Sequence, residues 1–246
     1  MGQRDRRSGG LGACGGVTAS GPQIYGRIGY LSQSTSPVAF VGVKLIDAVV
    51  LKGSLIRLEP LAAGHVPGLM AAAEEDRAAY AWTVVPRAEE VAGYVATQLA
   101  RDGLTPFAQV RVSDEAPVGC TAFMEPRAWP GRDELRAVGI GWTWLAGSAQ
   151  RTGINSEAKL LLLQHAFDDL GVARVDWQTD ARNQRSRRAI EGLGARFEGV
   201  LRNWSPSRVP GEEGRLRDSA MFSVTDAEWP AVKSSLFTRI ANGRLG

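Results

Sequence analysis

The chain has 246 residues, of which 44% are hydrophobic and 22% charged, and it carries a formal net charge of +3 with a pI near 9.1. This balance is typical of a soluble globular protein, and no apolar run approaches the ~18 residues that span a bilayer, so we expect no membrane partner. The arginines are spread along the chain, which argues against a nucleic-acid partner and suits a small polyanionic ligand.

The chain has two cysteines and two histidines: Cys14, Cys120, His65 and His165. They lie far apart in sequence, and neither histidine has a cysteine or carboxylate at metal-ligand spacing. We therefore expect no disulfide framework, no metal and no histidine-based catalytic triad. Such sparse cysteine usage favours a reducing compartment, so a cytoplasmic location is expected.

Residues 1–36 are rich in Gly, Ser and Arg and have no apolar periodicity, so a disordered N-terminal extension is predicted. One domain is expected over residues 37–240, followed by a flexible tail at 241–246. An alternating pattern predicts a strand over residues 55–59, ended by Pro60. Helical spacing predicts helices over 65–75 and 87–101, and places Leu99 on the apolar stripe of the second.

Further strands are predicted over residues 107–112, 118–124, 138–145, 173–179, 197–204 and 218–224, and helices over 155–170, 186–193 and from about 226. On the helix at 155–170 the apolar stripe ends at Gly171, and Glu157, Lys159, Gln164 and Asp168 are predicted to face outward. The mixture of helices and strands indicates an α/β (α+β) domain.

The segment from Leu145 to Asn155 connects a predicted strand to a predicted helix and reads Leu-Ala-Gly-Ser-Ala-Gln-Arg-Thr-Gly-Ile-Asn. A loop of this kind presents successive backbone N–H groups, and the helix adds the positive end of its dipole. The segment is therefore a candidate pyrophosphate site, the alternative being an ordinary strand-to-helix connection. It lacks both common nucleotide-binding fingerprints.

Two motifs carry a family resemblance. Gln150-Arg-Thr-Gly-Ile-Asn155 resembles the acetyl-CoA signature of the GNAT superfamily, except that Asn155 replaces a small residue; Asn is acceptable at a helix N-cap. Thr179-Asp-Ala-Arg-Asn183-Gln-Arg-Ser186, continuing to Leu193-Gly-Ala, resembles the segment that follows strand five in that superfamily. Its Thr-Asp-x-x-Asn and Ser are similar to the RimJ/RimL-like branch, which acetylates amino groups of proteins and small molecules.

The resemblance implies a central mixed, mostly antiparallel sheet of about six to seven strands, flanked by helices and splayed between strands four and five. It implies acetyl-CoA as co-substrate. Strand-four backbone groups would pair with the pantetheine arm, and the Leu145 N–H would stabilise the oxyanion. Asn183 would bind the pantetheine or thioester end, and Ser186 would protonate the leaving thiolate, unless Ser186 only caps its helix. The implied cofactor-binding residues are Trp144, Leu145, Ala146, Gln150, Arg151, Thr152, Gly153, Ile154, Asn155, Asn183 and Ser186.

The sequence departs from the family pattern at two catalytic places. Ile190 stands where many relatives have a tyrosine, and Gly139 stands where relatives often have a glutamate. A water chain can serve as the base, whereas Glu125, Glu134 and Asp176 are interpreted as surface charges. The four arginines Arg182, Arg185, Arg187 and Arg188 are candidates for phosphate contact, at least two of them being ordinary surface charges. Trp142 and Trp144 are expected on one side of their strand, in the core or in an acceptor pocket.

The expected function is therefore an acetyl-CoA-dependent N-acetyltransferase that acts by direct attack of a primary amine in a ternary complex. The amine acceptor is either a protein N-terminus or a small molecule. A non-catalytic acetyl-CoA-binding sensor is the alternative, and a homodimer is left open.

Overall fold

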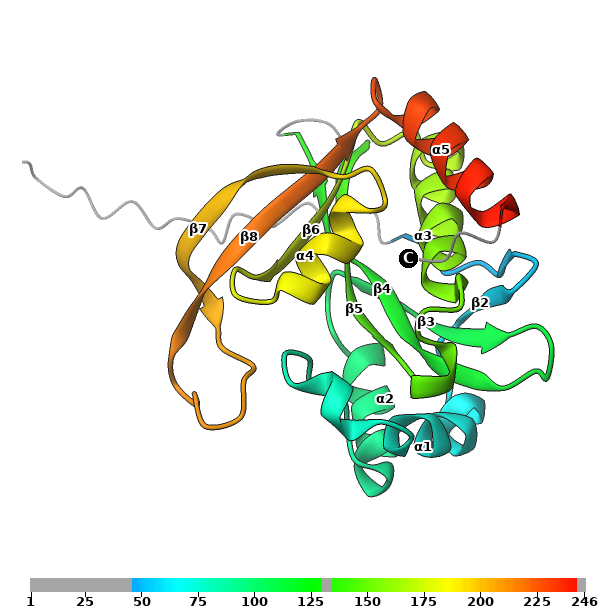
Figure 1. Cartoon of the computed structure of the whole chain (residues 1–246), viewed down its shortest axis with the longest axis vertical. Helices are drawn as coiled ribbons and strands as arrows, with labels where there is room; N and C mark the ends of the chain where they lie inside the picture. The colour runs from blue at the N-terminus through cyan, green and yellow to red at the C-terminus, as the bar shows by residue number, and fades with distance from the viewer. Residues whose placement is uncertain (1–45, 130–133, 243–246) are drawn as a thin grey trace, which may run out of the picture. The chain divides into compact units, whose positions relative to one another are not determined.

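The computed structural model describes residues 46–129 and 134–242, so the extension predicted over 1–36 and most of the tail predicted at 241–246 lie outside the described residues. Within these residues the chain forms eight strands and five α-helices (Figure 1). The strands are β1 (Leu51–Lys52), β2 (Ile56–Pro60), β3 (Leu104–Arg111), β4 (Pro117–Ala128), β5 (Leu135–Leu145), β6 (Arg174–Asp180), β7 (Arg196–Pro206) and β8 (Leu216–Thr225). The helices are α1 (Val66–Glu74), α2 (Val91–Leu99), α3 (Ile154–Gln164), α4 (Gln184–Glu191) and α5 (Trp229–Ala241).

The strands form one sheet in the order β1-β2-β3-β4-β5-β6-β8-β7. Every neighbouring pair is antiparallel except β5 and β6, which are parallel. Parallel neighbours need a long crossover, and α3 with its π-helical end (His165–Asp169) supplies it. The mixed, mostly antiparallel sheet is confirmed, with eight strands rather than six to seven because the short β1 adds a pair at the edge.

The helices form two packed pairs. Helix α1 packs on α2 and β4, and α2 also packs on β3; α3 packs on α5 and β2 (Figure 1). The core includes the fully buried rings of Phe107, Phe123 and Phe222 from β3, β4 and β8. Leu99 was predicted to be buried but is 52% exposed, because it is the last residue of α2 and Gln98 takes the buried position there.

The predicted outward face of α3 is wrong at two positions. Glu157 and Lys159 are only 6% and 4% exposed. The Glu157 carboxylate accepts hydrogen bonds from the backbone N–H groups of Ser54, Leu55 and Ile56 and from the Ser54 hydroxyl, at 2.6–2.9 Å. The carboxylate therefore joins α3 to the turn before β2, and this satisfied burial overrides the usual exposure of a charged residue.

Among the described residues, no helix combines the length and apolarity that crossing a membrane requires.

Candidate active site

The candidate site begins where β5 and β6 separate. The two strands pair only through Ala137–Gly139 and Arg174–Asp176, although β5 continues to Leu145 and β6 to Asp180. Beyond Gly139 the backbone groups of β5 that point toward β6 pair with no strand of the described residues. The predicted splay is confirmed, and it opens a wedge in the middle of the sheet.

The pairing of β5 with β4 shows which backbone groups face this wedge. Leu145 lies opposite Gly119, and the next residue, Ala146, donates its N–H to Val118 O at 2.7 Å. Hydrogen-bonded and non-hydrogen-bonded pairs alternate along an antiparallel ladder, so the Leu145 N–H points away from β4 and toward the wedge. The Ala146 N–H, expected to be free for a ligand, is instead used within the sheet.

A bulge interrupts β5 just before this point. Cys120 pairs with Trp144 and Ala122 with Gly141, so β5 has one extra residue, and Trp142 has a positive φ of 52°. A bulge re-aims the side chains around it. The expected simple alternation of Trp142 and Trp144 is therefore broken: Trp144 is 4% exposed and packs edge-on against Tyr80, while Trp142 lies at the bulge and is only partly buried.

The connection from β5 to α3 has the geometry of an anion-binding loop. A 3-10 turn (Gly147–Ala149) leads to Arg151, with φ 60°, and to Gly153, with φ 89°, which is the N-cap of α3. No side chain caps the first turn of α3, so its N–H groups and the positive end of its dipole are open to a ligand. The predicted cap is wrong: Gly153 occupies it, because a left-handed φ favours glycine, and Asn155 is the second helical residue.

Side chains of the loop hold the end of β5. The Gln150 amide donates to Leu145 O at 2.8 Å and accepts from Arg185, and the Tyr80 hydroxyl donates to the same carbonyl at 3.0 Å. Thr152 donates its hydroxyl to Ala149 O at 2.7 Å. Gln150 and Thr152 thus shape the loop. The N–H groups of Ser148, Ala149 and Gln150 are used within the protein, whereas those of residues 151–155 donate to no group in the described part of the chain.

Asn183 and Ser186 lie at the N-terminus of α4. Asn183 is the N-cap, and its side chain accepts a hydrogen bond from Ser186 N at 3.0 Å. The alternative role considered for Ser186 is therefore wrong, since the capping side chain is that of Asn183. The Ser186 hydroxyl is not needed for the cap.

The wedge contains a cavity of about 600 Å³ that brings together most of the predicted residues. Those that line it are Trp144, Leu145, Gln150, Asn155, Asn183 and Ser186. Ala146 and Ile154 are buried behind the loop, Arg151 is exposed, and Thr152 and Gly153 lie within the loop without lining the cavity. Of the four candidate arginines of α4 and its approach, Arg185 lines the cavity, whereas Arg182 and Arg187 bind groups of the protein.

Two buried donors in the cavity wall have no acceptor. The indole Nε1 groups of Trp144 and Trp177 are buried and have no hydrogen-bond partner in the described part of the chain, and both residues line the cavity. Buried polar groups are normally satisfied. A ligand that brings carbonyl acceptors, such as the amides of a pantetheine arm, therefore fits these residues.

Lys159 is a cavity residue that the sequence reasoning missed. Its amine donates to the hydroxyls of Thr121 and Thr143 at 2.7 and 2.8 Å, and Thr143 is part of the bulge. Burial, the only cause identified, lowers the pKa of Lys159 from 10.5 to about 7. The signal that identifies Lys159 as a cavity residue is its contact with threonine hydroxyls of β4 and β5. This contact forms only in the tertiary fold, so the sequence did not reveal it.

The three candidate carboxylates differ in their burial and in their contacts. Asp176 is 4% exposed and paired with Arg127 and Arg174 at 2.5 and 3.1 Å. Glu134 is exposed and pairs with Arg136. Glu125 is also exposed, but it lines the cavity, at a second bulge where its φ is 51°. The interpretation as a surface charge therefore holds for Glu134, is wrong for the buried Asp176 and is too simple for Glu125.

Comparison with known proteins identifies the class. A family model described as "Acetyltransferase (GNAT) domain" matches residues 56–196. A GCN5-related N-acetyltransferase from Brucella melitensis is 31% identical, with a TM-score of 0.68, over 78% of this chain and 86% of that one. A putative acetyltransferase from T. thermophilus is 33% identical, with a TM-score of 0.66, over 79% and 98%. None of the curated proteins compared with the sequence matches it.

The splayed sheet and its loop are thus those of an acetyltransferase fold. The chain belongs to the GNAT acetyltransferase family. Its fold neighbours include Mycobacterium smegmatis RimJ in complex with CoA-disulfide, at 20% identity and a TM-score of 0.62 over 80% of this chain and 94% of that one. At that identity the likeness to RimJ concerns the fold alone.

Proposed function

We propose that the protein is an acetyl-CoA-dependent N-acetyltransferase that transfers the acetyl group to a primary amine by direct attack in a ternary complex. The observation that carries the proposal is the single cavity that joins the wedge, the Gln150–Asn155 loop and the N-terminus of α4. We also propose a cytoplasmic location, which rests on the sparse cysteine usage of the sequence. Cys120 is buried. Its burial raises the pKa of the thiol, which argues against a covalent acetyl-cysteine intermediate.

In this proposal the loop before α3 holds the pyrophosphate through backbone N–H groups and the helix dipole. The exposed β5 backbone and the indoles of Trp144 and Trp177 bind the pantetheine arm. The Leu145 N–H faces the wedge, so it can stabilise the oxyanion that forms when an amine attacks the thioester carbonyl. Ser186 donates its proton to the departing thiolate, as Asn183 already caps the helix.

The attacking ammonium must first lose a proton. Glu125 is the carboxylate we assign to this step, because it lines the cavity and a bulge re-aims it from the strand. Its one side-chain contact in the described residues is a long one, from the Gln178 amide at 3.4 Å. A weakly bound carboxylate remains free to accept a proton from an arriving amine.

The test is to follow free thiol release with acetyl-CoA and a panel of amines and peptides. Ser186→Ala and Glu125→Gln should each lower kcat by roughly 10²–10⁴-fold while the acetyl-CoA-induced thermal shift stays unchanged. Glu134→Gln is the matched control, because Glu134 does not line the cavity. Unchanged turnover in both variants would remove these two residues from the mechanism.

One observation favours a second function, a non-catalytic acetyl-CoA sensor. Ile190 lines the cavity where many relatives have a tyrosine, and it cannot transfer a proton. Gly139 likewise cannot act as a base, because it has no side chain. A larger residue there would be crowded, since its Cβ would lie 3.0 Å from Met124 Cγ. Binding of acetyl-CoA without thiol release for any amine in the panel would select the sensor.

A further inference from the structure

The part of the cavity next to the bulge has a strongly cationic wall. Arg101, Arg208 and Arg217 all line the cavity, and they come from three separate segments of the chain. The guanidinium carbons of Arg101 and Arg208 lie 4.4 and 4.1 Å from the centre of the Trp142 ring. A tryptophan face attracts and orients a guanidinium, so Trp142 holds two of the three cations in place.

These arginines differ from many others because they form no ion pair with a carboxylate in the part of the chain that the structure describes. Among the described residues the ion-paired arginines are Arg57, Arg87, Arg111, Arg127, Arg136, Arg174 and Arg182. The cavity arginines make no ion pair in that part of the chain, and Arg217 has one hydrogen bond, from its Nε to Ser205 Oγ at 2.9 Å. Five N–H donors on each guanidinium thus remain largely unused at the cavity wall.

The electrostatic environment makes this arrangement unfavourable without a ligand. Burial lowers the pKa of both Arg208 and Arg217, and the charges of Arg217 and Arg101 lower that of Arg208 further. The charge of the Asp180 carboxylate opposes this effect on Arg217 but does not cancel it. Arg208 is an exposed residue overall, but its guanidinium packs against Trp142 inside the wall. An anion bound between the cations would relieve both the repulsion and the loss of hydration.

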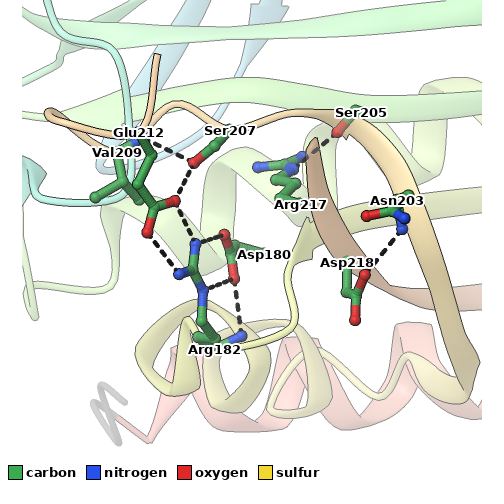
Figure 2. A network of polar contacts seen from close by, with 9 residues as sticks. All are labelled: Asp180, Arg182, Asn203, Ser205, Ser207, Val209, Glu212, Arg217 and Asp218. Carbon is green, nitrogen blue, oxygen red and sulfur yellow. Dashed lines mark hydrogen bonds and ion pairs between the residues drawn. The ribbon is translucent and has the colours of Figure 1, made fainter. Parts of the chain in front are cut away.

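A network of polar contacts holds the turn that carries Arg208. Figure 2 shows Arg182 between Asp180 and Glu212, with Ser207 completing the contacts of Glu212. The guanidinium of Arg182 donates to both carboxylates at 2.8–3.0 Å, and the Ser207 hydroxyl donates to Glu212 at 2.6 Å. The turn between β7 and β8 is thereby tied to the end of β6. The turn that carries Arg208 is therefore supported by side-chain contacts and is not a free loop.

The position of the cationic wall favours binding of the acceptor rather than of the cofactor phosphates. The anion-binding loop begins after Leu145, and Trp142 lies three residues earlier on β5, which corresponds to about 10 Å of strand. The carboxylates of Asp102 and Glu125 line the same cavity. Positive and negative groups together suit a molecule that has an ammonium at one end and an oxyanion at the other.

We propose that the acceptor is an amine that also carries an oxyanion, a carboxylate or a phosphate, bound by Arg208 and Arg217 against Trp142. This rests on the proposed acetyl-transfer function and specifies its substrate class. Guanidinium groups bind both oxyanions through paired N–H donors, so the two arginines select by charge and geometry. The source is either a small amino acid-like molecule or a peptide with an acidic side chain near its N-terminus, and the test has an arm for each.

The experiment compares matched acceptors by thiol release: an ω-amino carboxylate, an aminoalkyl phosphate and the uncharged amine of equal length, then dipeptides with Glu or Gln in second place. We expect kcat/KM to be about 10–100-fold higher for the anionic member of the preferred pair. Arg208→Ala and Arg217→Gln should each remove that preference by lowering kcat/KM for the anionic acceptor. Arg215→Ala is the control, since Arg215 is on the same turn but does not line the cavity.

Three outcomes would overturn the proposal. One is equal use of charged and uncharged acceptors in both arms. Another is a preference for anionic acceptors that survives in both Arg208→Ala and Arg217→Gln. The third is weaker acetyl-CoA binding in Arg208→Ala, measured by thermal shift, which would assign the arginine to the cofactor. If no amine is turned over, the proposed function fails separately; binding of inorganic phosphate that requires Arg208 would then support the oxyanion site, and its absence would refute it.

Discussion

Replacing Lys159 with methionine should remove a pH dependence from the free energy of unfolding. In the folded protein the amine donates to two threonine hydroxyls and pairs with no carboxylate among the described residues, and its pKa is lowered to about 7. In the unfolded chain the amine keeps its proton up to its ordinary pKa of 10.5. The unfolded state therefore binds more protons between these values, and stability rises with pH in that window.

The magnitude follows from the shift. One pKa unit corresponds to ~1.4 kcal/mol, so the fall from 10.5 to about 7 costs the folded protein about 5 kcal/mol wherever the amine is protonated. This cost is fully present below pH 7 and disappears as the pH rises toward the unfolded value. Between pH 7 and pH 9 about 2 kcal/mol of it should be relieved. Methionine fills a similar volume and leaves Thr121 and Thr143 hydrogen-bonded to each other at 2.9 Å.

The assay is urea denaturation at pH 6, 7, 8 and 9, followed by tryptophan fluorescence, for wild type and Lys159→Met. The stability of the variant relative to wild type should fall by about 2 kcal/mol from pH 7 to pH 9 and change little from pH 6 to pH 7. Lys52→Met is the control, because Lys52 is exposed, and its difference from wild type should not vary with pH. A constant difference for Lys159→Met across this range would show that the buried amine has no shifted titration.

Two further predictions concern α3. Glu157→Gln should destabilise the protein by about 3 kcal/mol, because a neutral amide cannot accept all the hydrogen bonds from Ser54–Ile56. Urea denaturation measures this loss, with the exposed Glu191→Gln as control, and a loss under 1 kcal/mol would contradict the prediction. Gly153→Val should abolish the thermal shift caused by acetyl-CoA, because φ at this N-cap is 89° and a branched side chain is strained there. A wild-type shift in a folded Gly153→Val protein would place the phosphates elsewhere.

Local sequence patterns predicted most of the fold because they report local geometry. The alternating and helical periodicities located most of the strands and the five helices, and Gly171 ends the α3 crossover with φ 65° as expected. The geometry of the loop from Gln150 to Asn155 was predictable for the same reason, because the loop joins a strand to a helix; that it binds the cofactor phosphates stays a prediction. Such features need only neighbours in sequence.

The features that escaped prediction depend on contacts between distant segments. Periodicity assigns a charged residue to the solvent side, so it could not indicate that Lys159 meets hydroxyls of β4 and β5. The bulge at Trp142 depends on pairing with β4, and it changes which way the indole points. Arg101 and Arg208 become neighbours only after the sheet has assembled around Trp142.

The Glu157 contact also constrains the order in which the chain can mature during its synthesis. The groups that donate to this carboxylate, in Ser54–Ile56, precede it by 101–103 residues. At ~5–20 residues per second a ribosome needs about 5–20 s to add that length. Throughout this interval the turn before β2 lacks the carboxylate that accepts these N–H groups in the folded protein. The nascent amino-terminal hairpin can therefore reach its final form only after α3 has been made.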